Sequence, residues 1–145
     1  MSTARHTIAS LEDLARLVEA DDGLFLRYSA GPEKDASNGP SRDVEAGVEM
    51  AGWSATPLSP EPWWTRTAKD WVARRVTKYV ELGSETGRRP WVLHGELVGR
   101  GPDHEPLLSR LAFVAWLEEP VLREADEHYT KVFDRGRASD EVRNG

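Results

Sequence analysis

The spacing of apolar residues near the start of the chain predicts a helix followed by a strand. A helical repeat follows Ser10, with apolar side chains at Leu11, Leu14, Leu17 and Val18. Ser10 stands three residues ahead of an acidic residue, which is typical of a helix N-cap. The turn-forming residues 21–23 (Asp-Asp-Gly) end the helix, and the large apolar side chains of residues 24–29 then predict a mostly buried strand.

Between positions 30 and 58 the chain loses this regular pattern. Glycine, proline and polar residues punctuate the stretch from Ala30 to Val48, which predicts a long loop, and loops of that length are commonly functional or mobile. Apolar residues return over residues 48–58 and predict a second strand, which Pro57 ends.

A long amphipathic helix is predicted next, with its start set by Pro60 and Pro62 and its end near residues 83–87. Its apolar stripe consists of Trp64, Ala68, Trp71, Val72, Val76, Tyr79 and Val80. Its opposite face over residues 66–78 is basic and consists of Arg66, Lys69, Arg74, Arg75 and Lys78. A solvated helix face accounts for most such patterns, and the alternative is an anionic partner such as a nucleotide phosphate or an acidic protein.

The second half of the chain completes an α+β pattern. Strands are predicted at 91–98, 105–108 and 111–117, and a last helix runs from Pro120 to about Phe133. Irregular connections between these elements favour one small α+β domain over residues 10–133, with a mixed or antiparallel sheet and two or three flanking helices. Residues 1–9 and 134–145 carry no pattern and are expected to be flexible ends.

Composition and charge narrow the classes of protein that this sequence can encode. The 145 residues suffice for one domain, and the absence of cysteine excludes disulfides, thiolate metal sites and cysteine nucleophiles. The net charge of −6 argues against a general nucleic-acid coat protein. With no secretory signal and no apolar run of membrane length, we expect a cytoplasmic protein without a membrane partner, whose oligomeric state is left open.

Short motifs offer little chemistry by themselves. The four histidines are never four residues apart, and the adjacent ligands of residues 103–105 (Asp-His-Glu) point in alternating directions, so no metal site is predicted. Residues 52–56 lack the closing glycine of a nucleophile elbow. Residues 99–101 (Gly-Arg-Gly) lack the lysine of a P-loop and predict a turn. Of the tryptophans, Trp64 and Trp71 are expected in the core, whereas Trp53 is a candidate either to line a pocket or to lie in the core as well.

Across nearly its whole length the chain resembles a group of short, uncharacterised actinobacterial proteins. Three parts of the sequence carry this resemblance: residues 26–32 (LRYSAGP), residues 61–64 (EPWW), and residues 90–93 (PWVL) together with 98–103 (VGRGPD). The group itself implies no function.

A more remote resemblance, in the order of elements and in three separated motifs, is to the Arg class of ADP-ribosyltransferases, which cleave the nicotinamide bond of NAD. That class has an arginine on its first strand, a Ser-x-Ser/Thr motif on a second strand, and a glutamate between a loop and a later strand. The matching positions here are Arg27, Ser54-Ala55-Thr56 and Asp103-His104-Glu105. The predicted loop at 30–47 stands where the family commonly has a helix.

This resemblance implies an ADP-ribosyltransferase-like fold, NAD as the cofactor and no metal. The implied catalytic residues are Glu105, Arg27 and Ser54, and the implied cofactor-binding residues are Arg27, Tyr28, Trp53, Ser54, Thr56 and Asp103. Arg27 would hold the pyrophosphate through charge-assisted hydrogen bonds, and Glu105 would stabilise the positive charge that develops on the ribose. The hydroxyls at 54 and 56 lie on one side of a strand and would arrange the ribose, while an aromatic ring would stack on the nicotinamide.

The rival hypothesis is a non-catalytic binding or regulatory domain that uses the basic helix face or the tryptophans to meet a partner. The two hypotheses differ in one spatial expectation. The enzyme requires Arg27, Ser54 and Glu105 to converge on one concave surface, whereas the binding domain does not.

Overall fold

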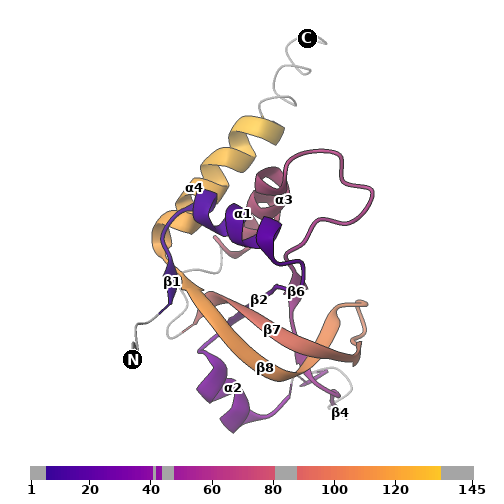
Figure 1. The fold of residues 1–145 in the computed structure, drawn as a ribbon. Helices are drawn as coiled ribbons and strands as arrows, with labels where there is room; N and C mark the ends of the chain where they lie inside the picture. Colours follow the sequence, from indigo (N-terminus) through magenta and orange to yellow (C-terminus); the bar gives the residue numbers. More distant parts are fainter. Residues whose placement is uncertain (1–5, 41, 44–47, 81–87, 135–145) are drawn as a thin grey trace.

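A long antiparallel hairpin, β7 (Arg89–Arg100) and β8 (Pro106–Leu117), forms the centre of the fold (Figure 1). The structure is a computed structural model and describes residues 6–40, 42–43, 48–80 and 88–134. The strand order is β1-β8-β7-β2-β6, with β1 (Thr7–Ile8) parallel to β8 and β2 (Phe25–Ser29) antiparallel to β7. A separate pair is formed by β3 (Arg42–Asp43) and β4 (Val48–Glu49).

Two short strands join opposite edges of this sheet. In β5 (Trp53–Ser54) Ser54 pairs with Leu107 of β8, and in β6 (Thr56–Pro57) Thr56 pairs with Leu26 of β2. Because only Ala55 separates the two strands, the segment connects β8 to β2 and curls the sheet. The curl brings β2, β5, β6 and the end of the β7–β8 hairpin close together.

Three helices cover one face of the sheet, and a fourth lies on the opposite face (Figure 1). The first group consists of α1 (Leu11–Ala20), α3 (Ala68–Val76) and α4 (Glu119–Tyr129). They share a core with the sheet in which Leu14, Trp71 and Val92 are buried. On the other face α2 (Pro32–Asn38) lies against β8, and Trp91, Leu93 and Leu108 form a second core there. Alternation along β7 explains the division, because neighbouring residues such as Trp91 and Val92 point to opposite faces.

The fold class is confirmed as α+β, with a mixed sheet and, among the described residues, four α-helices. The N-cap prediction is also confirmed, since the Ser10 hydroxyl accepts a hydrogen bond from the Asp13 amide. Strands predicted at 24–29 and 91–98 correspond to β2 and to part of β7. The last helix continues as a π-type segment, Thr130–Asp134, and α3 continues as a 3₁₀ turn, Thr77–Tyr79.

Several predicted boundaries are wrong for identifiable reasons. The long helix begins at Ala68 rather than near Pro60, because the Thr67 hydroxyl caps it by accepting from the Asp70 amide. The strands predicted at 105–108 and 111–117 are one strand, β8, which continues through a bulge at Arg110, where φ is 50°. The single strand predicted over 48–58 is divided into β4, β5 and β6, and the loop predicted from 30 to 48 contains α2.

The two predicted chain ends have different outcomes. Thr7 and Ile8 lie within the predicted flexible N-terminus, yet they pair with Trp116 and Leu117 of β8. Residues 1–5, the tail at 135–145 and the predicted helix end at 83–87 lie outside the described residues.

Candidate functional site

Five of the seven residues that the ADP-ribosyltransferase resemblance singles out meet at one small cavity. It has a volume of about 250 Å³, and we call it the Arg27–Glu105 cavity. Its lining residues come from β2, from the β5–β6 segment, from the 3₁₀ turn after α3 and from the β7–β8 turn: Leu26, Arg27, Tyr28, Ser54, Ala55, Thr56, Tyr79 and Glu105. Arg27, Ser54 and Glu105 therefore converge, because the curled sheet brings their strands together.

Arg27 is already held by two groups of the protein. Its Nε and Nη2 donate to the two carboxylate oxygens of Asp35, at 2.7 and 3.3 Å, and its Nη1 donates to the carbonyl oxygen of Ser54 at 2.7 Å. The side chains of Arg27 and Asp35 are 14% and 7% exposed, so this ion pair is largely buried. The guanidinium thus joins β2, α2 and β5 and forms a rigid wall of the cavity.

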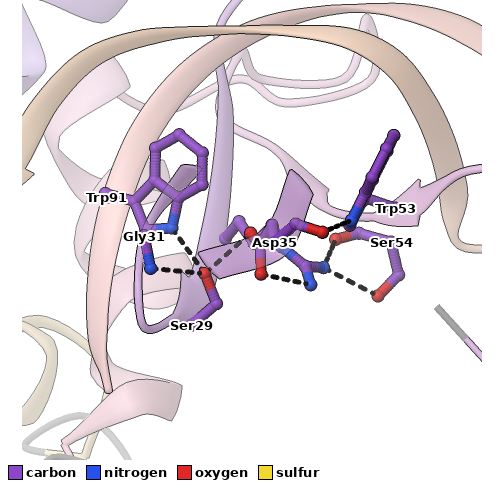
Figure 2. A network of polar contacts seen from close by, with 7 residues as sticks. Ser29, Gly31, Asp35, Trp53, Ser54 and Trp91 are labelled. Carbon is purple, nitrogen blue, oxygen red and sulfur yellow. Dashed lines mark hydrogen bonds and ion pairs between the residues drawn. The ribbon is translucent and has the colours of Figure 1, made fainter. Parts of the chain in front are cut away.

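A buried hydroxyl extends the contacts of Asp35 into the second core (Figure 2). Ser29 Oγ donates to Asp35 Oδ2 at 2.8 Å and accepts from Trp91 Nε1 at 2.9 Å and from the Gly31 amide at 3.1 Å. Its one donor and both acceptor positions are therefore satisfied, as a buried hydroxyl requires. We call Arg27, Ser29, Asp35 and Trp91 the Asp35 network. Sequence reasoning missed it, although Arg27 and Ser29 stand two apart on one face of a strand that is otherwise apolar.

Two tyrosines and two hydroxyl residues form other walls of the cavity. The rings of Tyr28 and Tyr79 stack with centroids 5.9 Å apart, and Thr56 Oγ1 lies 3.2 Å from the Tyr79 hydroxyl. Ser54 contributes its backbone carbonyl to Arg27, and its Oγ lies 3.5 Å from Arg27 Nη1. These groups offer flat aromatic surface and neutral hydrogen-bonding atoms, which suit a ring or a sugar.

Glu105 is the acidic residue that lines the cavity, and it ends the turn between β7 and β8. The Gly101 amide donates to the Glu105 carbonyl at 2.9 Å, and the Asp103 amide donates to Glu105 Oε2 at 2.9 Å. A Cβ at Gly101 would collide with the Glu105 carboxylate, so the glycine lets the carboxylate fold over the turn. Arg27 is paired with Asp35, so Glu105 is the charged residue of the cavity lining that forms no ion pair with any described residue.

Two of the predicted cofactor-binding residues do not line this cavity. Trp53 precedes Ser54 on the same strand and points the other way, where its Nε1 donates to the Asp35 carbonyl at 3.1 Å (Figure 2). Asp103 is exposed in the β7–β8 turn. The structure therefore brings Arg27, Tyr28, Ser54, Thr56 and Glu105 together at the cavity, whereas the side chains of Trp53 and Asp103 do not line it.

A second polar cluster joins α3 to α4, away from the cavity. Asp70 accepts from Arg66 Nε at 2.9 Å and lies 2.7 Å from Nε2 of His128. Burial raises the pKa of Asp70, but the hydrogen bonds and positive charges of His128 and Arg66 outweigh it and lower the pKa below its ordinary value. Among the described residues, no group of three histidine and acidic side chains is arranged to hold a metal ion.

Comparison with known proteins supplies a family. The family model of DUF6098, described as a family of unknown function, matches residues 1–141. The chain belongs to this family. No curated protein and no solved structure matches the chain. In the part of the chain that the structure describes, no helix has the length and apolar character needed to span a membrane. DUF6098 membership assigns no activity, so the argument for function depends on the sites themselves.

Proposed function

We propose that the Arg27–Glu105 cavity binds the nicotinamide-ribose end of NAD. The protein would then cleave the bond between nicotinamide and ribose, or transfer the ADP-ribose to an acceptor, as the resemblance to ADP-ribosyltransferases implies. One observation carries the proposal. Five residues that the resemblance picked out from distant parts of the sequence, Arg27, Tyr28, Ser54, Thr56 and Glu105, line one cavity. The helix α2 also stands in the region where that family commonly has a helix.

The size and charge of the cavity limit what it can hold. Pockets for whole drug-sized ligands have volumes of about 300–1,000 Å³, so about 250 Å³ suits one ring with its sugar, and the rest of the dinucleotide would lie outside. A carboxylate beside aromatic rings also favours a positively charged group, such as the pyridinium ring of NAD.

The bonds of Arg27 change the role proposed for it. A pyrophosphate would have to compete with the Asp35 carboxylate, which accepts from Arg27 Nε at 2.7 Å. We therefore assign Arg27 a positioning role: it holds Ser54 through the carbonyl bond and keeps the cavity wall in place.

Glu105 is the group proposed to act on the reaction itself. As the glycosidic bond breaks, its electron pair leaves with neutral nicotinamide, and positive charge develops on the ribose. A nearby carboxylate stabilises that charge mainly in the transition state. Water or another nucleophile then bonds to the ribose carbon and releases a proton.

Nicotinamide release from NAD by wild type, Glu105→Gln and Glu96→Gln tests this function. Glu96 lies on β7 with an exposed side chain, so its variant is the matched control. Glu105→Gln should lower kcat by orders of magnitude with little change in NAD binding, whereas Glu96→Gln should behave as wild type. A wild type that releases no nicotinamide and is not stabilised by NAD in a thermal-shift assay refutes the function. Equal turnover by Glu105→Gln refutes the role of its carboxylate.

A second candidate function, a non-catalytic binding domain, is favoured by a different observation. Trp63 is 63% exposed although it belongs to a cluster of three tryptophans next to the basic residues of α3. If the NAD tests fail, this surface is the remaining functional feature to pursue.

A further inference from the structure

Three tryptophans near the start of α3 form a cluster of touching rings that extends from the core to the surface. Ring centroids lie 5.0 Å apart for Trp64 and Trp71, 5.7 Å for Trp63 and Trp71, and 5.9 Å for Trp63 and Trp64, all in edge-to-face geometry. Trp71 is 1% exposed, whereas Trp63 is 63% exposed. The buried ring thus fixes the position of an exposed one, which would give a partner a large, rigid apolar contact.

Arginine side chains lie over two rings of this tryptophan cluster, Trp64 and Trp71, and over the ring of Phe133. The guanidinium carbons lie 4.4 Å from the Trp71 ring centroid for Arg75, 5.8 Å from Trp64 for Arg74, and 5.1 Å from Phe133 for Arg66. Stacking of this kind holds a guanidinium plane while leaving its edge able to donate hydrogen bonds. We call this the Trp63 surface, and it consists of Trp63, Trp64, Arg66, Arg74, Arg75 and Phe133.

Part of the basic face predicted over 66–78 is neutralised by the protein itself. Arg66 pairs with Asp70 at 2.9 Å, and Lys69 pairs with Glu12 at 3.2 Å. Among the described residues, no carboxylate forms an ion pair with Arg74, Arg75 or Lys78. Five arginines elsewhere in the described part of the chain do have carboxylate partners: Arg16, Arg27, Arg89, Arg110 and Arg123.

Arg75 is partly buried and lies within the electrostatic influence of the positively charged Arg74. Its Nε is buried and has no acceptor among the described residues. Burial, and after it the positive charge of Arg74, lower the pKa of Arg75, while Glu61 and Tyr79 act in the opposite direction. An external carboxylate beside them would relieve the repulsion between the two guanidinium groups.

We propose that the Trp63 surface binds an acidic segment of a partner protein, with an apolar side chain of that segment against the Trp63 ring and its carboxylates on Arg74 and Arg75. The chemistry of the surface matches such a segment in two respects: the Trp63 indole is exposed, and Arg74 and Arg75 form no ion pair with a carboxylate of the described residues. A short polypeptide is favoured over a nucleic acid because Arg74 and Arg75 can pair with only a few negative charges, whereas a polyphosphate chain presents charge along its whole length to a protein with a net charge of −6. This inference is independent of the NAD cavity.

Fluorescence anisotropy with three labelled probes tests the proposal. The probes are a glutamate-rich peptide with one central phenylalanine, the same peptide with glutamine in place of glutamate, and a single-stranded oligothymidine. We expect the acidic peptide to bind, and the neutral peptide and the oligonucleotide to bind at least about tenfold more weakly. Binding of the acidic peptide should also weaken as salt is added. Failure of the acidic peptide to bind up to about 1 mM, which corresponds to only about 4 kcal/mol of binding free energy, overturns the proposal, as does tighter binding of the oligonucleotide.

Matched variants locate the binding site. Trp63→Ala and Arg74→Glu should each weaken peptide binding by about tenfold or more, the scale of an interface hot spot. Their controls are Leu97→Ala, at a side chain that is 52% exposed on β7, and Arg110→Glu, at a side chain that is 87% exposed on β8. Neither control should change binding by more than about twofold. If all four variants bind like wild type, the peptide binds elsewhere and the proposal is wrong.

Discussion

Removal of the Asp35 carboxylate is the most direct test of how α2 is held to the sheet. In Asp35→Leu, Arg27 loses two hydrogen bonds and Ser29 loses the acceptor of its hydroxyl. The Arg27 side chain is only 14% exposed, so water cannot fully replace the lost partner. Breaking one side of a buried ion pair costs about 3–5 kcal/mol of unfolding free energy. That is a large part of the roughly 5–15 kcal/mol that stabilises an ordinary domain.

The double variant separates the ion pair from simple packing. Arg27→Met alone should also destabilise the protein, because it leaves the Asp35 carboxylate buried without its cation. Arg27→Met combined with Asp35→Leu should recover much of either loss, since apolar residues of similar volume often replace a buried ion pair at little cost. The loss of unfolding free energy in the double variant should therefore be smaller than the sum of the losses in the two single variants.

Urea unfolding of wild type, the two single variants and the double variant measures these free energies. Asp103→Ala, in the exposed β7–β8 turn, is the control and should change stability by no more than about 0.5 kcal/mol. A loss below about 1 kcal/mol for Asp35→Leu, or strictly additive losses, would refute the argument that this pair is buried and coupled.

Three further predictions concern the core, a glycine and an acid. Trp71→Ala should cost about 3–5 kcal/mol because Trp71 is 1% exposed, and unchanged thermal stability would show that the ring is not a core residue. Gly31→Ala should cost about 1–3 kcal/mol because φ is 116° and a Cβ would lie 3.0 Å from the Trp116 ring. Gly99→Ala should cost about 1 kcal/mol or less, because its Cβ would meet Leu107 at an ordinary contact distance of 4.0 Å; equal unfolding temperatures for the two variants would contradict this. The lowered pKa of Asp70 means that its ionised carboxylate contributes to the unfolding free energy. This contribution is fully present above about pH 3.8, the ordinary pKa, and is lost as pH falls through the lower pKa of the folded state. The unfolding free energy of Asp70→Asn, measured in urea between pH 6 and about pH 2, should therefore fall less than that of wild type as pH is lowered. Parallel plots of unfolding free energy against pH for the two proteins would disprove this prediction.

Local patterns were sufficient to predict the elements whose stability depends on their own residues. The helix after Ser10 was predictable because its cap and its apolar repeat are close in sequence. The strands at β2 and β7 were predictable because their large apolar residues favour extended chain. Burial of Trp71 followed from its place on the apolar stripe of α3.

Elements that depend on distant partners were not predictable in the same way. The segment that forms α2 begins with proline, consists mostly of polar residues and lies between two glycines, and it is anchored by the hydrogen bond that Arg27 on β2 donates to Asp35. The long strand β8 continues through Arg110 at a positive φ because the pairing with β7 on both sides of the bulge holds it there. Neither tertiary contact has a signature within a short window of sequence.

The candidate site also combines features that the sequence determines with features that depend on tertiary contacts. The sequence by itself determined which residue types were available, including Arg27, Ser54 and Glu105. Only the tertiary structure decided that these three meet, because β5 pairs with β8 while β6 pairs with β2. It also decided that Trp53 faces α2 and that Arg27 is already bonded to Asp35. The physical reason is that side-chain alternation is local to a strand, whereas strand pairing depends on residues far apart in the chain.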